Sequence, residues 1–172
     1  MITNTHVTKV IKERINPILL GSGYSTIIGR KAWRYFNDKV YLVLIQGVGA
    51  YFSSVTGFPS ISITASINIF YVDFPDRKTC KKISNGLPLP VETECHFRFS
   101  LDKIDPQSDY VVNIASSTER GRKDVWWIDF SGDNLNDAIT DLSLALQKQA
   151  FPLVEKPCYQ RPEQLKRFLT RS

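Results

Sequence analysis

Residues 60–71 read SISITASINIFY, and polar and apolar side chains alternate along this stretch as far as Phe70. Successive side chains of a β-strand point to opposite faces of the sheet, so the alternation predicts one long strand with a single buried face. The buried face carries the side chains of Ile61, Ile63, Ala65, Ile67, Ile69 and Tyr71. An apolar sheet face needs a second layer, and the helices of this chain are the available cover.

Further strands are indicated on both sides of this stretch. Residues 31–36 alternate, the pair Asn37-Asp38 is a turn signal, and residues 40–45 are apolar on both faces. This pattern predicts a hairpin whose second strand lies in the centre of the sheet. Residues 94–101 and 125–130 also alternate. We therefore expect an antiparallel sheet of about five strands.

Two segments show the periodicity of helices. Apolar residues recur every three or four positions along residues 7–18, with a kink expected at Asn16-Pro17 because proline lacks a backbone N–H. A second apolar stripe runs along residues 135–146, and Asp133 or Asn134 is expected to cap its start. We expect both helices to cover one face of the sheet and to pack on the isoleucines of the long strand. The fold class is therefore α+β.

The composition is that of one folded domain. Of the 172 residues, 42% are apolar and 23% are charged. Pro152 is expected to end the second helix, and residues 155–172 are expected to form a loosely attached C-terminal helix that opens at Pro162. Residues 1–12 lack the pattern of a secretory signal, and residues 40–55 are too interrupted to cross a bilayer. These features predict a cytoplasmic protein.

Residues that bind metals or act as nucleophiles are few and scattered. The candidates are three cysteines and two histidines, without the paired spacing of a structural zinc site: His6, Cys80, Cys95, His96 and Cys158. Cys95 and His96 are adjacent, and adjacent residues of a strand point to opposite faces. The serine elbow motif of hydrolases is missing from the sequence. We therefore expect no metal and no cofactor, and the sequence favours a protein that is not an enzyme.

Positive charge is distributed over several short clusters. The formal net charge is +5, from 22 Lys and Arg against 17 Asp and Glu. The clusters lie near residues 30–34, 77–82, 120–123 and 166–171, with acidic residues between them. Such clusters usually form a solvated surface, although basic patches beside aromatic rings also bind nucleic acids. Nucleic acid is therefore a weakly supported alternative partner, and no membrane partner is expected.

The polar face of the long strand is the most informative surface of the predicted sheet. Its side chains carry hydroxyls and an amide but no charge: Ser62, Thr64, Ser66 and Asn68. Such a face either meets water or forms the floor of a groove for a partner, because charged residues are depleted at the centre of interfaces. Arg34, His96 and Arg98 join this face if their strands lie beside it, and arginine is a favoured contact residue.

The tryptophan pair at residues 126 and 127 offers one more candidate. If residues 125–130 form a strand, the two rings point to opposite faces, and one of them belongs to the core. The other ring is either covered by a helix or loop or exposed as an anchor for a partner. We include Trp127 among the candidate binding residues.

Several motifs follow one another along the chain. They are NP at residues 16–17, WRYF at 33–36, the alternating strand, ECHFRF at 94–99, DVWWID at 124–129 and FPLVE at 151–155. Over residues 5–156 this order resembles a bacterial family of domains of unknown function that occur as small stand-alone cytoplasmic proteins. The chain differs at Ser100, where the family is expected to have glycine. The resemblance implies no established activity.

Three functions are consistent with these observations. The lack of a catalytic motif and the uncharged strand face favour a non-enzymatic protein-binding module. One case is an immunity protein, a role served by some small proteins of similar build that block a toxin made by a neighbouring gene. A nucleic-acid-associated protein is the second hypothesis, and it predicts an affinity that falls steeply with salt. An enzyme of unrecognised type is the third, and a deep pocket holding His96, Arg98 or Asp129 would favour it.

Overall fold

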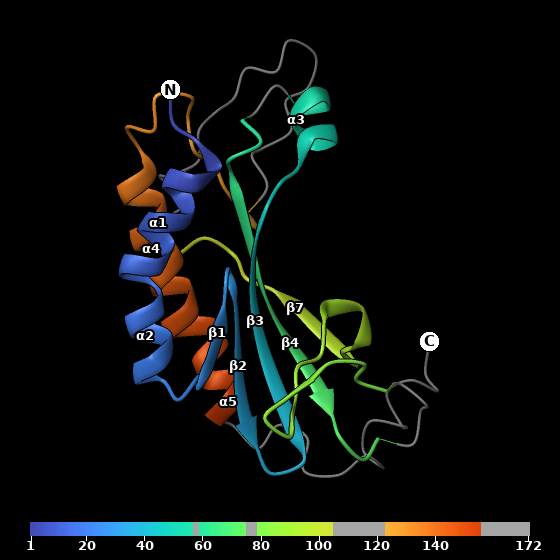
Figure 1. The fold of residues 1–172 in the computed structure, drawn as a ribbon. Coiled ribbons are helices and arrows are strands. Elements are labelled where there is room, and N and C mark those ends of the chain that lie inside the picture. Colours follow the sequence, from blue (N-terminus) through green and yellow to red (C-terminus); the bar gives the residue numbers. More distant parts are fainter. Residues whose placement is uncertain (57–58, 75–78, 105–122, 156–172) are drawn as a thin grey trace.

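The fold is an antiparallel sheet with helices packed on one side (Figure 1). The structure is a computed structural model, and it describes residues 1–56, 59–74, 79–104 and 123–155. Side by side in the sheet lie β1 (Thr26–Ile28), β2 (Lys31–Phe36), β3 (Lys39–Gly47), β4 (Ile63–Tyr71) and β7 (Phe97–Ser100). A sixth strand, β8 (Val125–Trp126), also pairs with β4. All of these pairs are antiparallel, which confirms the predicted α+β class.

The central strands are the most buried part of the sheet. β2 and β3 form the predicted hairpin, and Asn37 in its turn has a positive φ of 51°, which asparagine tolerates. Residues 40–45 of β3 are buried on both faces, as their continuous apolar sequence predicts. β4 begins at Ile63 rather than at residue 60, because a turn precedes it. In that turn the N–H of Ser62 donates to the carbonyl of Pro59 at 3.0 Å.

Helices cover one face of the sheet (Figure 1): α1 (Asn4–Arg14), α2 (Asn16–Gly21), α4 (Leu135–Ala145) and α5 (Phe151–Glu155). The isoleucines of β4 are buried beneath them, in one apolar cluster with Ile11 and Leu142. α1 gives way to α2 at Ile15, next to the predicted kink at Asn16-Pro17. The predicted packing of both helices on the alternating strand is therefore confirmed.

The helix that begins after Asn134 does not end at Pro152, contrary to the prediction. α4 continues through a turn of π-helix (Leu146–Ala150) directly into α5, and Pro152 is the second residue of α5. A π-helical turn bonds each N–H one residue further back than an α-helix does, so it starts a new hydrogen-bond register. The missing N–H of Pro152 then falls in a first turn, where proline is tolerated.

The opposite face of the sheet, which we call the outer face, is covered by two separate pieces of chain. One is the short helix α3 (Ala50–Thr56), whose Phe52 packs with Trp127. The other is the segment 79–96, which packs on Trp33 and neighbouring apolar residues of the sheet. This segment contains a hairpin of β5 (Ile83–Ser84) and β6 (Leu87–Pro88), followed by the 3₁₀ turn η1 (Glu92–Glu94).

The hairpin in this segment has a local sequence signal. Its two turn residues, Asn85 and Gly86, both have positive φ (51° and 76°), the conformation of the tight turns that asparagine-glycine pairs favour. Leu89 and Cys95 follow the hairpin and are buried against the outer face. Helices therefore cover one face, as predicted, and much of the other face is covered as well.

Some predictions concern residues outside the described ranges. The C-terminal helix predicted within residues 155–172 falls on residues that the structure does not describe beyond Glu155, and so does Cys158. Residues 77–78 and 120–122 of two basic clusters, and the whole cluster at residues 166–171, also fall outside the described ranges. Within the ranges that the structure does describe, no helix is long and apolar enough to pass through a membrane.

Candidate functional site

Two hollows lie next to each other on the outer face. The first, which we call the apolar hollow, has a volume of about 370 Å³ and lies where the β1–β2 turn meets residues 82–91. The second, the polar cleft, has a volume of about 230 Å³ and is bordered by β3, β4, β7 and α3. Gln46 of β3 lines both hollows, so they are direct neighbours.

Buried apolar side chains form the floor of the apolar hollow. Each is at most 4% exposed: Trp33, Leu44 and Leu89. The indole Nε1 of Trp33 donates a hydrogen bond of 3.0 Å to the carbonyl of Pro90, which fixes the ring. Ile28 and Val91 lie at the rim with 49% and 36% of their surface exposed. The hollow therefore presents the apolar surface of its rim to solvent, above a floor whose shape packing already fixes.

The charged side chains that line the apolar hollow are all cationic: Arg30, Lys31 and Lys82. Arg30 is held by α1, because its Nη2 donates to Thr8 Oγ1 at 2.7 Å and to the carbonyl of Asn4 at 3.1 Å. Lys31 and Lys82 form no ion pair with another described residue. Two of the three cations are therefore available to a ligand.

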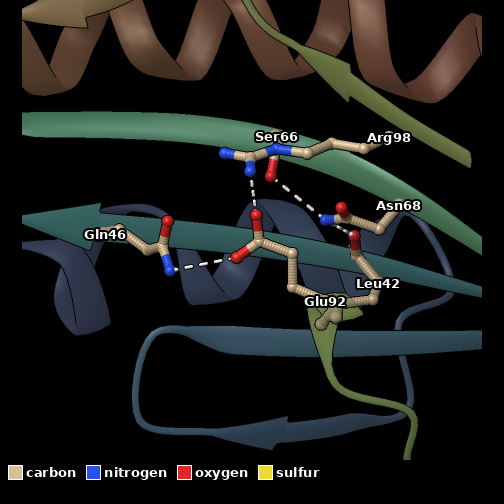
Figure 2. A network of polar contacts seen from close by, with 6 residues as sticks. All are labelled: Leu42, Gln46, Ser66, Asn68, Glu92 and Arg98. Carbon is tan, nitrogen blue, oxygen red and sulfur yellow. Dashed lines mark hydrogen bonds and ion pairs between the residues drawn. The ribbon is translucent and has the colours of Figure 1, made fainter. Parts of the chain in front are cut away.

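A polar bridge separates the two hollows, and Glu92 of η1 builds it. The Glu92 carboxylate forms an ion pair with Arg98 of β7 and accepts a hydrogen bond of 3.2 Å from Gln46 Nε2 (Figure 2). The 3₁₀ turn is itself fixed, since the Glu94 carboxylate accepts a bond of 3.0 Å from the N–H of Val91. An anchored turn thus places one carboxylate over the sheet, between β3 and β7.

A buried polar layer lies beneath this bridge (Figure 2). Asn68 and Ser66 of β4 are 0% and 2% exposed. The Asn68 amide donates to Ser66 Oγ at 3.1 Å and to the carbonyl of Leu42 at 3.2 Å. Asn68 Oδ1 has no hydrogen-bond partner among the described residues. This part of the uncharged strand face is therefore an internal layer and does not meet water.

The walls of the polar cleft carry many kinds of hydrogen-bonding group. They come from β3, β4, β7 and the residue before β8: Gln46, Thr64, Arg98, Ser100 and Asp124. Phe52 of α3 supplies an aromatic side, and its ring is stacked on Trp127 with 5.8 Å between centroids. Segments that are distant in sequence thus bring hydroxyls, an amide, both charges and an aromatic ring to one small cleft.

The structure brings four of the predicted binding residues together on the outer face: Thr64, Ser66, Asn68 and Arg98. Ser62 shares this face but is fully buried, and its Oγ accepts a bond of 3.0 Å from the N–H of Ile128. His96 lies near the other end of β4. Its Nδ1 accepts a bond of 3.0 Å from the N–H of Tyr71, and its ring contacts Phe74. Ser62 and His96 therefore support the fold and line neither hollow.

Arg34 and Trp127 do not belong to the polar layer. Arg34 pairs in register with Tyr41, which is buried under the helices, so Arg34 does not join the outer face. Its Nη1 donates to the carbonyl of Ser22, at the end of α2, at 2.7 Å. Trp126 is the core ring, and Trp127 is 5% exposed against Phe52. Trp127 is therefore covered by a helix, one of the two predicted outcomes, and is not an exposed anchor.

Three residues that shape the site belong to no recognisable sequence motif: Gln46, Phe52 and Glu92. Only Glu92 follows a signal that sequence reasoning missed, since the Asn85-Gly86 turn marks a hairpin that returns the chain towards the sheet. The roles of Gln46 and Phe52 depend on which segments pack on the outer face. Periodicity within β3 and α3 does not contain that information.

The part of the chain that the structure describes contains no site suited to metal binding or to thiol chemistry. Its His, Cys, Asp and Glu side chains form no group of three that is able to hold a metal ion. Burial raises the pKa of the Cys80 thiol, which disfavours the reactive thiolate. Of the three residues whose common pocket would favour an enzyme, only Arg98 lines either of the two hollows.

Comparison of the chain with protein-family models, with curated proteins and with solved structures found no match. The resemblance to a bacterial family of domains of unknown function therefore stays a prediction that rests on the motifs alone.

Proposed function

We propose that this protein is a non-enzymatic protein-binding module whose apolar hollow binds a partner segment with an apolar side chain flanked by carboxylates. The observation that carries this proposal is the combination of an apolar floor with a charged lining that is entirely cationic. Ile28 and Val91 at the rim offer apolar surface that a partner would bury.

Each part of the hollow contributes a different property to binding. Full burial of one aliphatic side chain of the partner is worth about 1.5–3 kcal/mol. Lys31 and Lys82 attract carboxylates, and charges at the rim of an interface raise the association rate more than the final affinity. The net charge of +5 acts in the same direction over longer distances. The expected partner is therefore an acidic protein.

A nucleic-acid groove is less well supported. Arg30 and Arg34 hold α1 and α2 with their guanidinium groups, so this predicted basic cluster does not form one free patch. The aromatic ring of the hollow, Trp33, is 4% exposed and offers no face for base stacking. Lys31 and Lys82 remain as isolated rim charges, which suits a peptide with a few carboxylates better than a phosphate chain.

An immunity protein is the specific case that we propose within this class. In this case the protein acts in the cytoplasm and blocks a toxin encoded by the neighbouring gene. The neighbouring gene is then expected to encode a protein whose surface carries an acidic segment with an apolar anchor. A neighbouring gene for an enzyme of intermediary metabolism would remove the immunity case but not the binding module.

Selection from a displayed library of random peptides tests the binding chemistry. We expect the enriched peptides to combine aliphatic or aromatic residues with Asp or Glu, and to bind more weakly at high salt. The double substitution Lys31→Glu/Lys82→Glu is expected to weaken their binding about tenfold, because it reverses both rim charges. Lys12→Glu/Lys148→Glu makes the same change of net charge at exposed positions of the helix layer and is expected to leave binding unchanged.

Two outcomes would overturn this proposal. One is the enrichment of basic peptides, and the other is an equal loss of binding in both double variants, which would indicate a nonspecific charge effect. A single-stranded oligonucleotide that binds more tightly than every selected peptide would place the nucleic-acid hypothesis first. Circular dichroism of both variants checks that their fold is intact.

A further inference from the structure

The polar cleft contains hydrogen-bonding groups that the fold itself does not use. Thr64 Oγ1, Ser100 Oγ and Gln46 Oε1 form no hydrogen bond with another described residue. Arg98 pairs with Glu92 through Nη1, its side chain is 50% exposed, and its other guanidinium N–H groups have no partner in the described ranges. Two hydroxyls, an amide oxygen and part of a guanidinium are thus available in one place.

These groups are held by paired strands. Gln46 lies directly opposite Thr64 in the β3–β4 register, and Ser100 lies opposite Ser66 in the β4–β7 register, so their side chains share the outer face. The Glu92 carboxylate contacts both Arg98 and Gln46 and so restrains the two side chains (Figure 2). A site on strands is more precisely positioned than one on loops. The arrangement therefore exists before any ligand arrives.

The charges around the cleft disfavour an anionic ligand. One cation, Arg98, is accompanied by two carboxylates, those of Glu92 and Asp124. The described lining therefore offers a phosphate or carboxylate no excess of positive charge. A neutral ligand with several hydroxyls does not need such an excess, because a hydroxyl donates to a carboxylate and accepts from a guanidinium.

The aromatic side and the volume of the cleft restrict the ligand further. Phe52 lines the cleft and is stacked on Trp127 with an angle of 20° between the ring planes, which fixes the orientation of its ring. An aromatic face packs against the C–H groups of a ring that carries hydroxyls at its edge. The volume of the cleft, about 230 Å³, is smaller than that of the pockets that bind drug-sized ligands, which is about 300–1,000 Å³.

We propose that the polar cleft binds a neutral polyhydroxylated ligand of the size of one sugar ring. Its hydroxyls would bond to Arg98, Thr64 and Ser100, and its carbon face would pack on Phe52. This site is separate from the apolar hollow, and its occupation does not require a protein partner.

A titration followed by nuclear magnetic resonance tests the site with named probes. The probes are glucose, galactose, N-acetylglucosamine and inorganic phosphate. We expect saturable shifts of the amides of residues 46–47, 64–65 and 98–100 with at least one sugar, at millimolar concentration, and none with phosphate. Thr64→Val and Ser100→Ala are each expected to weaken sugar binding about fivefold, because each removes one hydrogen bond.

Matched variants keep the test specific. Thr5→Val makes the same chemical change at an exposed position of α1 and is expected to bind sugar like the parent protein. Lys31→Glu/Lys82→Glu is also expected to keep sugar binding, which separates this site from the protein-binding hollow. Three results would overturn the proposal: no saturable shift with any sugar, tighter binding of phosphate than of every sugar, or unchanged affinity in both Thr64→Val and Ser100→Ala.

Discussion

Two buried polar side chains in the interior differ in whether they form hydrogen bonds. Asp141 is 5% exposed, and its carboxylate accepts bonds from Trp126 Nε1 at 2.8 Å and from the N–H of Ile104 at 3.1 Å. Tyr24 is fully buried, and its hydroxyl has no hydrogen-bond partner within the described part of the chain. A buried polar group without a partner costs stability, whereas a bonded one contributes to it.

Removal of the Tyr24 hydroxyl is therefore expected to be harmless or favourable. Burial raises the pKa of Tyr24, so the hydroxyl stays neutral and is lost without loss of a charge. We expect Tyr24→Phe to raise the free energy of unfolding by up to about 1 kcal/mol, because an unsatisfied group leaves the core. Urea unfolding followed by tryptophan fluorescence measures the change.

Tyr51→Phe is the matched control for this prediction. Tyr51 is 84% exposed, so the same substitution there is expected to leave the free energy of unfolding unchanged. A loss of more than about 1 kcal/mol in Tyr24→Phe would show that the hydroxyl makes a bond in solution.

Among the elements, the start of α4 is held by side-chain hydrogen bonds in addition to backbone ones. The Asp129 carboxylate accepts bonds from Ser131 Oγ at 2.8 Å and from the N–H groups of Gly132 and Asp133. Asn134 donates to the carbonyl of Trp127 at 2.7 Å. These bonds fix the turn that joins β8 to the helix, so the carboxylate connects the sheet to the helix layer.

This turn is expected to make stability depend on pH. Burial acts to raise the pKa of Asp129, but the hydrogen bonds outweigh it, and the pKa is lowered overall. The carboxylate therefore contributes stability above the pKa of an unfolded aspartate, about 3.9, and this contribution is lost as the pH falls through the lower folded value. We expect Asp129→Asn to be less stable than the parent at pH 7, with a difference that narrows below about pH 4.

Urea unfolding of both proteins at pH 7, 5 and 3 measures this difference. The asparagine variant keeps the size and one acceptor oxygen of the side chain but does not titrate. A stability difference that is the same at all three pH values would show that the ionised form of Asp129 does not stabilise the turn.

The periodicity of the sequence predicts which residues form the central strands better than it predicts which segments pack on the sheet. The alternation of residues 60–71 and the apolar run of residues 40–45 place β4 and β3 correctly, because both patterns are local. Asn68 and Ser66 look like surface residues for the same reason. They are buried because the segment 79–96 docks over them, and its docking depends on contacts such as Trp33 to Pro90, which are 57 residues apart. No local pattern contains such a contact.

The candidate site shows the same limit. Of the predicted binding residues, Thr64 and Arg98 line the polar cleft. Arg34 and His96 bond elsewhere in the fold, because the strand pattern does not determine which strands are neighbours. The sequence does not predict the hydrogen bond between Gln46 and Glu92, because η1 and β3 come into contact only in the folded molecule.

For the whole molecule, the two faces of the sheet differ in how they are covered. The helix layer and the strand face beneath it share one large apolar cluster, whereas the outer face is covered by two small clusters. Ile83 and Leu87 of the small hairpin are 66% and 42% exposed, so this hairpin buries little of its own surface. Segments with few buried contacts open locally at a lower free energy than the core. The outer cover is therefore the less stable layer.

Hydrogen exchange is expected to show this difference in stability. The amide of Leu89, which donates to the carbonyl of Lys82 at 2.8 Å, is expected to exchange through local opening of the hairpin. Amides of Val43 and Ile67 in the central strands are expected to exchange only through global unfolding, with protection at least about a hundredfold higher. Native-state exchange at increasing urea concentration distinguishes the two routes. Equal protection of Leu89 and Val43 would show that the outer cover unfolds together with the core.

The packing of α1 on α4 has a consequence for how the chain is made. Arg14 of α1 bonds to Asn136 and Thr140 of α4, which are 122 and 126 residues later in the chain. A ribosome that adds about 5–20 residues per second needs on the order of ten seconds to bridge that interval. During this time the apolar stripe of α1 is without its helical neighbour. The nascent chain therefore exposes a ready binding surface for chaperones until the last quarter of the domain emerges.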